Sequence, residues 1–227
     1  MTVDVSVIVP CYNEAYTIAN AIQELQSLRD LFQVEIIVVD DGSTDGSSQK
    51  LRELSGIKLE RHETNRGKGA AIATGAKSAT GEVIIIQDAD LEYDPKEIPD
   101  LANPILAGKC DIVYGSRFRG NIEGMTLSHY VGNKVLSFFT GLLYGVEVTD
   151  MMTGHKAFRA HLFKQFDLKS TGFGFEMEVT VKALEKGYRI QEVPIRYSRR
   201  KFGQPKIRWR DGFKSMIQLF AYRLGLL

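Results

Sequence analysis

The alternation of short apolar runs with helical stretches constrains the fold of this 227-residue chain more than any other feature. Runs rich in β-branched residues at positions 5–9, 34–39 and 83–86 are typical of strands, and apolar residues at helical spacing lie between them. The run at 83–86 is almost continuously apolar, as expected of a parallel strand that is covered on both faces. Because residues 1–117 alternate in this way throughout, we predict an α/β fold with a doubly wound, mostly parallel sheet.

The second half of the chain has a different composition. Residues 127–146 are rich in Leu, Phe and Tyr, residues 176–185 predict a helix, and an amphipathic stripe follows near the end of the chain. No linker separates the halves 1–117 and 118–227, so we expect one domain over residues 1–227. Further predicted elements of the first half are helices at 13–32, 70–78 and 95–106 and strands at 57–62 and 111–114.

Composition and charge exclude several classes of protein. With 29 Lys and Arg against 28 Asp and Glu, the formal net charge is +1, so we expect no nucleic-acid partner. The two cysteines, Cys11 and Cys110, are too few for a four-cysteine zinc site. The N-terminus lacks a basic segment followed by an apolar one, which predicts a cytoplasmic location. Residues 135–146 form a charge-free stretch much shorter than the roughly 20 residues that a spanning helix needs.

Acidic residues follow two of the predicted strands. Asp40 and Asp41 end one strand, and Asp88 and Asp90 follow another. Ligands of open α/β sheets bind beyond the carboxyl ends of the strands, so both acidic groups are expected to face one crevice. Glu92 adds a third oxygen donor shortly after Asp90. Ligand sets made only of oxygen suit Mg²⁺ or Mn²⁺, which complete their coordination with substrate phosphates and water.

Glycine-rich nucleotide motifs are incomplete in this chain. It has no Gly-x-x-x-x-Gly-Lys-Ser/Thr sequence, and residues 67–72 lack the third glycine of the dinucleotide fingerprint, which argues against P-loop enzymes and nicotinamide dehydrogenases. Residues 65–69, which include Lys68, could present backbone N–H groups and a cation to a phosphate at a helix N-terminus. A tight turn with solvated basic residues explains the same segment equally well.

Five segments together resemble a known family. In chain order they are VIVPCYNE at 7–14, VVDDGSTD at 38–45, N-x-G-K-G at 65–69, QDADLE at 87–92 and GSRF at 115–118. In that order and at those intervals they resemble family 2 glycosyltransferases of the GT-A fold, and within that family the dolichyl-phosphate mannose synthases and related polyprenyl-phosphate sugar transferases. The likeness continues through residues 176–207. It implies a nucleotide-sugar-binding half at 1–117 and an acceptor half at 118–227.

The resemblance implies roles for residues at the donor end. Those expected around the nucleotide sugar are Pro10, Tyr12, Glu14, Asp41, Lys68, Asp88, Arg200 and Lys206. Asp88 and Asp90 match the family's Asp-x-Asp, with Asp90 as a direct metal ligand and Asp88 as a ligand of the metal or the ribose. Glu92 stands where the synthases often have glutamine and keeps an oxygen donor for the metal. Pro205 replaces the serine expected in the basic loop that clamps the donor diphosphate.

Arginines and acids of the second half are candidates for the acceptor site. A polyprenyl phosphate is already an anion, so it needs cations that position it rather than a general base. Arg117 and Arg119 follow a predicted strand and, with Asp90, are the candidate catalytic residues, because a guanidinium holds phosphate through two hydrogen bonds. A solvated pair of loop arginines is the alternative. Glu176 and Glu178 could be acids around a hydroxyl acceptor, one of them as base, or ordinary charges on a helix surface.

Two apolar stripes of the second half are candidates for membrane contact. The first consists of Leu127, Val131, Val135, Phe138, Phe139, Leu142 and Leu143. The second consists of Phe213, Met216, Ile217, Phe220, Ala221 and Leu224, flanked by basic residues. Such stripes lie in a membrane interface, where they could guide a lipid tail, or pack into a core.

Together these features predict a glycosyltransferase that moves a hexose from a nucleotide diphosphate sugar to a polyprenyl phosphate. The resemblance alone implies that the transfer is inverting. We expect GDP-mannose as donor before UDP-glucose, Mg²⁺ or Mn²⁺ as cofactor, and a peripheral location on the cytosolic face of a membrane, with or without a small membrane subunit. A family 2 enzyme with a glycan hydroxyl acceptor and a silent nucleotide-sugar-binding subunit are the alternatives. A sugar nucleotidyltransferase is disfavoured because residues 10–14 lack a glycine-rich basic loop.

Overall fold

A seven-stranded sheet lies at the centre of the computed structural model, which describes residues 3–172, 174–200 and 209–226. The strands are β1 Val5–Cys11, β2 Val34–Asp40, β3 Lys58–Arg61, β4 Val83–Ile86, β5 Ile112–Glu123, β6 Lys156–Arg159 and β7 Gln191–Ser198. Their spatial order is β3-β2-β1-β4-β6-β5-β7. Strand β6 runs antiparallel to β4 and β5, and the other neighbouring pairs are parallel. The predicted α/β fold with a mostly parallel sheet is confirmed.

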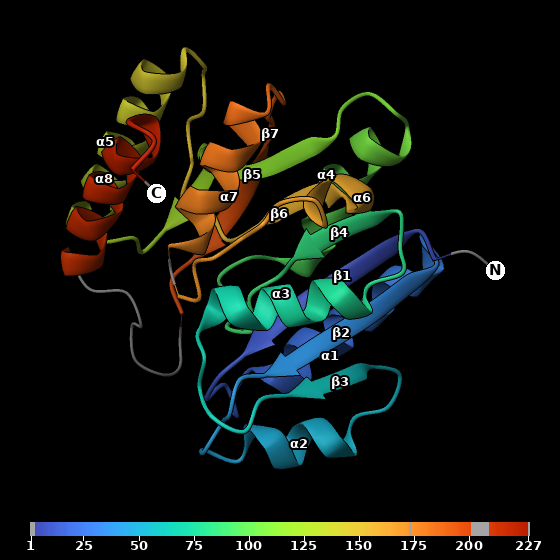
Figure 1. Ribbon diagram of the computed structural model, residues 1–227. Helices are drawn as coiled ribbons and strands as arrows, with labels where there is room; N and C mark the ends of the chain where they lie inside the picture. Colours follow the sequence, from blue (N-terminus) through green and yellow to red (C-terminus); the bar gives the residue numbers. More distant parts are fainter. Residues whose placement is uncertain (1–2, 173, 201–208, 227) are drawn as a thin grey trace.

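Helices cover both faces of this sheet (Figure 1). One apolar core includes residues of α1 Ile18–Gln26, α2 Ser47–Glu53 and α4 Ile98–Leu106, and the other includes residues of α3 Lys68–Ser78, α6 Ala160–Phe163 and α7 Phe175–Glu185. The 3₁₀ helix η1 Ser27–Asp30 follows α1, and η2 Pro95–Glu97 precedes α4. Along β1, Val7 and Val9 belong to the first core and Ile8 to the second. This two-sided burial explains the continuously apolar sequence of the central strands.

Helices α5 Leu127–Tyr144 and α8 Trp209–Arg223 lie side by side beyond α7 (Figure 1). A third apolar core joins them, with Leu136 from α5, Leu219 from α8 and Met177 from α7. Among the residues that the structure describes, no helix is long and apolar enough to span a membrane.

The strand predicted at 111–114 is much longer in the structure. Strand β5 continues because it pairs with β7 a second time, after an irregularity between Ser116 and Asn121. Gly120 permits this close approach, since a Cβ on it would lie 2.0 Å from the carbonyl oxygen of Ile195 in β7. The extension carries the chain from the sheet to the start of α5.

The apolar stripe predicted near the end of the chain does not form the buried face of α8. Ile217, Phe220 and Leu224 are exposed, whereas Ser215 and Leu219 are buried. Of the stripe, Met216 packs against the third core and the ring of Phe220 contacts Phe139 of α5. The described part of the stripe is therefore only partly covered.

Candidate active site

A cleft of about 770 Å³ lies at the carboxyl ends of β1 and β4 and extends to α5 and α8. The residues selected from the sequence that line it are Pro10, Tyr12, Glu14, Asp41, Lys68, Asp88, Asp90, Glu92, Arg117, Glu176 and Arg200. Arg119 and Glu178 are described but are not part of this lining, and Lys206 lies outside the described residues. The fold thus brings Asp41, the acids at 88–92 and most of the predicted cations to one place, whereas Asp40 is not part of this lining.

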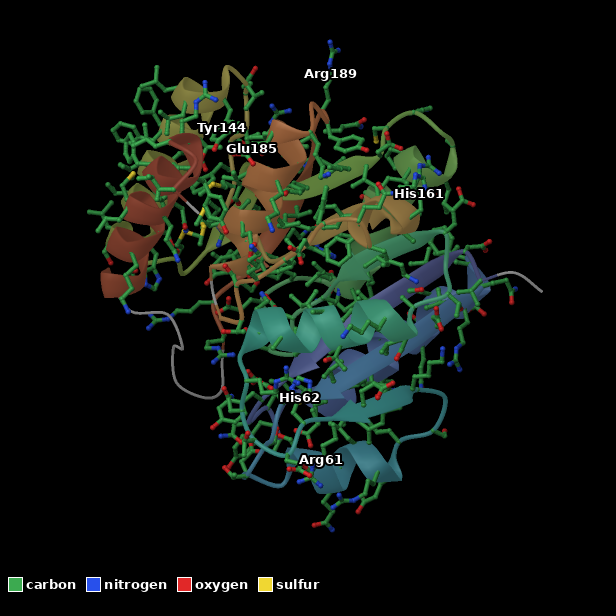
Figure 2. The ribbon with its side chains drawn as sticks, in the orientation of Figure 1. Arg61, His62, Tyr144, His161, Glu185 and Arg189 are labelled. Atoms are coloured by element: carbon green, nitrogen blue, oxygen red, sulfur yellow. The ribbon has the colours of Figure 1, made fainter. Side chains whose placement is uncertain are left out.

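Asp41 holds the loop that precedes α3. Its carboxylate accepts hydrogen bonds from the backbone N–H groups of Arg66 (2.9 Å) and Gly67 (2.7 Å) and from Nδ1 of His62 (2.6 Å), which is labelled in Figure 2. These backbone N–H groups are engaged inside the protein, so they are not offered to a phosphate as the sequence suggested. Lys68 lines the cleft together with Asn65 and Gly67 of this loop region.

Lys68 is a buried cation between two acids. Its Nζ lies 2.7 Å from Oδ1 of Asp88 and 2.8 Å from Oε1 of Glu176. Burial by itself lowers the pKa of Lys68, but the charges of Asp88 and Glu176 outweigh it and raise the pKa, so the ammonium group stays charged. Glu176 is therefore a buried, paired acid and not a charge on a helix surface.

Arg200 binds further acids of the same cluster. Its Nη2 lies 2.8 Å from Oε1 of Glu14 and 2.9 Å from Oδ2 of Asp90, and its Nε lies 3.8 Å from Oε1 of Glu92. Burial and the charge of Asp88 raise the pKa of Asp90 to about 6. Burial and the charge of Asp90 raise the pKa of Glu92 to about 7. Three acidic side chains are thus gathered around Arg200.

The acids suit a divalent cation but do not yet surround one. Within the described ranges, no three His, Cys, Asp or Glu side chains lie close enough together to hold a metal ion. Asp88 and Asp90 bind the cations Lys68 and Arg200 instead. Clustered carboxylate oxygens are the donors that Mg²⁺ and Mn²⁺ prefer, so the residues fit these ions.

Two residues of the cleft loops have left-handed backbone although they are not glycine. Asn13, directly before Glu14, has φ 53°, and Leu91, between Asp90 and Glu92, has φ 61°. Asparagine tolerates this conformation, whereas for a leucine it costs about 1–2 kcal/mol. Backbone strain of this kind is common at functional sites. At Leu91 it coincides with the turn that carries two acids of the cluster.

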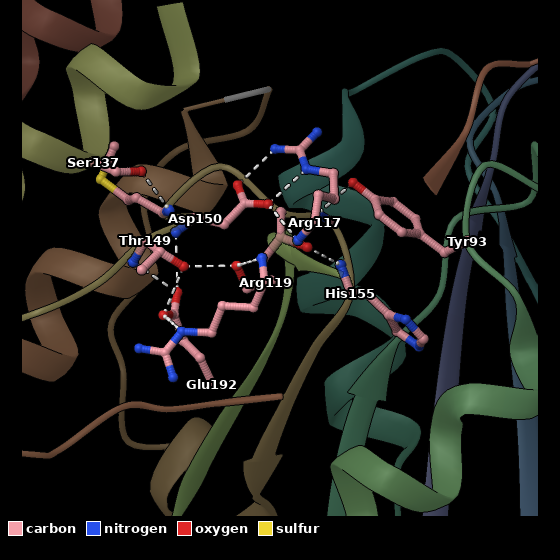
Figure 3. Close-up of polar contacts among 12 residues, drawn as sticks. Tyr93, Arg117, Arg119, Ser137, Thr149, Asp150, His155 and Glu192 are labelled. Carbon is pink, nitrogen blue, oxygen red and sulfur yellow. Dashed lines mark hydrogen bonds and ion pairs between the residues drawn. The ribbon is translucent and has the colours of Figure 1, made fainter. Parts of the chain in front are cut away.

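Arg117 and Arg119 do not form one phosphate seat. Nε and Nη2 of Arg117 each lie 2.7 Å from an oxygen of Asp150, and Arg117 lines the cleft (Figure 3). Arg119 binds Glu192 instead, with Nε 3.1 Å from Oε2, and its side chain is 42% exposed. Of the two, Arg117 is therefore the one that can meet a ligand in the cleft.

Glu178 lies beneath the segment that precedes α7. Its carboxylate accepts hydrogen bonds from the backbone N–H groups of Lys169 (2.9 Å) and Ser170 (2.6 Å) and lies 2.9 Å from Nζ of Lys182. Burial acts to raise the pKa of Glu178, but these partners outweigh it and lower the pKa. The structure thus separates Glu178 from the cleft, while Glu176 lines it.

Gly154 is a site residue that the sequence did not reveal. A Cβ on Gly154 would lie 2.3 Å from Oδ2 of Asp88 and 3.2 Å from Nζ of Lys68. Its N–H donates a hydrogen bond to the hydroxyl oxygen of Tyr93 (3.0 Å). The segment before β6 therefore packs directly on the acid cluster, where a side chain has no room. A glycine in the sequence does not predict a place in the site, because its contact with Asp88 arises only in the folded chain.

The other end of the cleft mixes apolar side chains with a few polar ones, among them Ser128, His129 and Ser215. Its apolar lining includes Val135 and Leu136 from α5, Met216 from α8 and Met125, which precedes α5. It also includes Met152, which packs against the third apolar core. Methionine side chains adapt their shape to flexible apolar ligands. The cleft therefore joins a charged end to an end that suits hydrocarbon.

Comparison with known proteins shows that the chain is a glycosyltransferase. The family model described as Glycosyl transferase family 2 matches residues 6–166, so the chain belongs to glycosyl transferase family 2. It is 34% identical over 200 residues to the uncharacterized protein MJ1222 of Methanocaldococcus jannaschii, a match that covers 85% of this chain and 81% of the relative.

Two further relatives have names that describe an activity. The chain is 33% identical over 196 residues to the low-salt glycan biosynthesis hexosyltransferase Agl6 of Haloferax volcanii. This match covers 85% of this chain and 47% of the relative. It is 29% identical over 226 residues to a dolichol-phosphate mannosyltransferase of Pyrococcus furiosus. This match covers 95% of this chain and 62% of the relative. The chain thus spans less than two thirds of the length of these two proteins.

Solved structures with the same fold include glucosyl-3-phosphoglycerate synthase of Mycobacterium tuberculosis. Its complex with phosphoglyceric acid has a TM-score of 0.79 at 22% identity, over 99% of this chain and 81% of that one. Its complex with Mn²⁺, UDP and glucosyl-3-phosphoglycerate has a TM-score of 0.76 at 21% identity, over the same shares. These matches confirm the GT-A fold.

Proposed function

We propose that this glycosyltransferase moves a hexose from a nucleotide diphosphate sugar to a polyprenyl phosphate, with inversion at the anomeric carbon. The observation that carries the proposal is the single cleft that joins acids and cations to a methionine-rich apolar wall. A donor diphosphate matches the charged end, and a lipid tail matches the apolar end. The dolichol-phosphate mannosyltransferase among the relatives favours GDP-mannose, and neighbours solved with UDP-glucose make UDP-glucose the next choice.

At the donor end, we assign the base and ribose to Pro10, Tyr12, Glu14 and Asp41, all in the cleft lining. Asp88, Asp90 and Glu92 would hold Mg²⁺ or Mn²⁺, which would supply positive charge to the diphosphate as it departs. The structural neighbours were solved with Mn²⁺ or Mg²⁺ and UDP, which supports this choice of ion. Arg200, with Lys206, is assigned to the donor diphosphate.

At the acceptor end, we assign the lipid phosphate to Arg117. A phosphate oxygen is already negative, so it can attack the anomeric carbon without transferring a proton to a base. As the new carbon–oxygen bond forms, the bond to the nucleoside diphosphate breaks and its electron pair leaves with the diphosphate. Rate enhancement then comes chiefly from placing the two substrates in line.

We propose that the protein works at the cytosolic face of a membrane. The exposed apolar side chains of α5 and the end of the chain are Leu127, Tyr130, Val131, Val135, Phe138, Leu142, Ile217, Phe220, Leu224 and Leu226. Val135 is both 40% exposed and part of the cleft lining, so the uncovered face adjoins the apolar end of the cleft. A lipid acceptor could then enter from the bilayer. A small membrane subunit seated on this face is the alternative arrangement.

The test is incubation of the purified protein with Mg²⁺ or Mn²⁺, a short polyprenyl phosphate and either GDP-mannose or UDP-glucose. Glycolipid is detected by mass spectrometry. We expect product from one donor and none from Asp90→Asn, which removes a charge at nearly constant shape. Metal-dependent nucleotide binding without product from either donor would overturn the proposal for the isolated chain and leave a hydroxyl acceptor or a missing membrane subunit.

A glycan hydroxyl acceptor is the second candidate because Glu176 lines the cleft. A hydroxyl must lose its proton as it attacks, so this reaction needs a general base. Oε1 of Glu176 contacts Nζ of Lys68 (2.8 Å), whereas Oε2 has no hydrogen-bond partner among the described residues. Glu176→Gln distinguishes the two reactions: loss of a base lowers kcat by about 100-fold or more, whereas transfer to a phosphate is affected much less.

A further inference from the structure

Asp150 contacts Arg117 at three points (Figure 3). Its Oδ2 accepts hydrogen bonds from the backbone N–H (3.0 Å) and Nε (2.7 Å) of Arg117, and its Oδ1 accepts one from Nη2 (2.7 Å). Both side chains are buried. A guanidinium has five N–H groups in one plane, and Asp150 engages two of them. The contact therefore fixes the plane of the guanidinium and the direction of its remaining donors.

The surrounding segment holds Asp150 in turn. Its backbone N–H donates to Oε1 of Glu192 in β7 (3.0 Å), and the same oxygen accepts the N–H of Thr149 (2.8 Å). The N–H of Met151 donates to Oγ of Ser137 in α5 (3.0 Å). Figure 3 shows these contacts converging on one turn. Asp150 is thus anchored both to the sheet and to the helix with the exposed apolar face.

We propose that Asp150 is a positioning residue for the acceptor phosphate, which it serves by orienting Arg117. This inference rests on the proposed function, in which Arg117 binds that phosphate. Asp150 has two opposite effects on the binding of phosphate by Arg117. Its hydrogen bonds direct the guanidinium, whereas its negative charge weakens the attraction between Arg117 and a phosphate.

Asp150→Asn separates the two contributions. The amide keeps the size of the side chain but presents an N–H₂ group to a donor of Arg117, so the guanidinium loses its fixed plane. If Asp150 positions Arg117, phosphate binding weakens even though the site gains net positive charge. We expect about 10-fold weaker binding, the effect of losing one charge-assisted hydrogen bond. If Asp150 only balances charge, binding becomes tighter.

The experiment measures the binding of citronellyl phosphate and of inorganic phosphate by calorimetry, together with the binding of UDP and GDP in the presence of Mg²⁺. The matched control is Asp111→Asn, since Asp111 also lies 2.7 Å from an arginine Nε, that of Arg159, away from the cleft. We expect weaker phosphate binding and a higher KM for the lipid phosphate in Asp150→Asn only, with nucleotide binding and the donor KM unchanged. Equal or tighter phosphate binding would overturn the inference.

Failure of the proposed function gives a different pattern. If the wild type binds citronellyl phosphate but transfers no sugar, the proposed reaction is wrong, and the binding comparison still decides the role of Asp150. If the wild type binds neither phosphate, both proposals are overturned. If Asp150→Asn also loses nucleotide binding, Glu192→Gln is measured instead, because Glu192 holds the backbone N–H of Asp150. Weaker phosphate binding with intact nucleotide binding in that variant supports the inference. Unchanged phosphate binding overturns it.

Discussion

At the scale of single residues, the donor end of the cleft is a group of acids with two side-chain cations bound among them. Lys68 binds Asp88, and Arg200 binds Glu14 and Asp90. A carboxylate oxygen that accepts a guanidinium hydrogen bond is less available to a metal ion. Arg200 and a divalent cation should therefore compete for Asp90, until a donor diphosphate offers Arg200 another anion.

Arg200→Gln tests this competition. Without nucleotide, we expect Mn²⁺ to bind the variant several-fold more tightly, because a competing cation has been removed. With Mn²⁺ present, we expect UDP or GDP to bind roughly 10-fold more weakly, because one charge-assisted contact to the diphosphate is lost. Calorimetric titrations measure both. Arg196→Gln removes the same charge from an exposed side chain of β7 that does not line the cleft, so it is the control and should leave Mn²⁺ binding as in the wild type.

Gly154→Ala tests the packing of the acid cluster. The new methyl group would overlap Oδ2 of Asp88, so we expect the carboxylate to move and metal-dependent nucleotide binding to fall by about 10-fold or more. Gly132→Ala is the control, because a Cβ there meets nothing within 4 Å and a helical alanine is slightly stabilising. Nucleotide affinity equal to that of the wild type in Gly154→Ala would show that Asp88 does not need its observed place.

At the scale of elements, Glu35 of β2 joins the strands of the nucleotide half. Its Oε1 accepts hydrogen bonds from the hydroxyl groups of Ser6 in β1 (2.6 Å) and Thr80 before β4 (2.8 Å). Its Oε2 lies 3.0 Å from Nζ of Lys58 in β3. Burial alone would raise the pKa of Glu35, but these partners outweigh it and lower the pKa to about 2.

A lowered pKa in the folded state makes Glu35 a source of acid sensitivity. Its contribution to the free energy of unfolding is fully present above the ordinary pKa of 4.5 and is lost as the pH falls toward about 2. We expect Glu35→Gln to be less stable than the wild type at neutral pH and to lose less stability between about pH 5 and pH 3. Urea unfolding at several pH values measures this. Glu63→Gln, at an exposed position, should follow the wild-type curve.

At the scale of the whole molecule, the nucleotide half is closed on both faces, whereas α5 and α8 leave an apolar face uncovered. An exposed apolar face of this kind commonly marks contact with a membrane or a partner protein. It adjoins the apolar end of the cleft, so the proposed lipid recruitment would take place beside the proposed site of sugar transfer.

Phe138→Glu tests the proposed contact with membranes. The side chain is 65% exposed, so the charge should not disturb the core, and we expect binding to anionic vesicles to fall by about 10-fold, the effect of losing one inserted aromatic side chain. Vesicle flotation measures binding. Leu31→Glu introduces the same charge at a leucine that is 64% exposed in the nucleotide half and should float like the wild type. Equal flotation of both variants and the wild type would contradict the membrane proposal.

The sequence by itself determined the alternating α/β layout and the gathering of the acids at one edge of the sheet. Both follow from local rules: apolar periodicity defines strands and helices, and the acids Asp41, Asp88 and Asp90 follow strands whose carboxyl ends share that edge. The family likeness likewise rested on short segments in a fixed order. These features need no knowledge of which side chains touch.

Only the tertiary structure decided which partner each charge has. Glu176 and Glu178 are two positions apart, yet one lines the cleft and the other binds the segment before α7. Arg117 and Arg119 likewise take separate acids, Asp150 and Glu192. These contacts join residues that are distant in the chain, so they depend on how helices and strands pack and not on local sequence. Burial then fixes each pair, because a charge removed from water must find its counter-charge nearby.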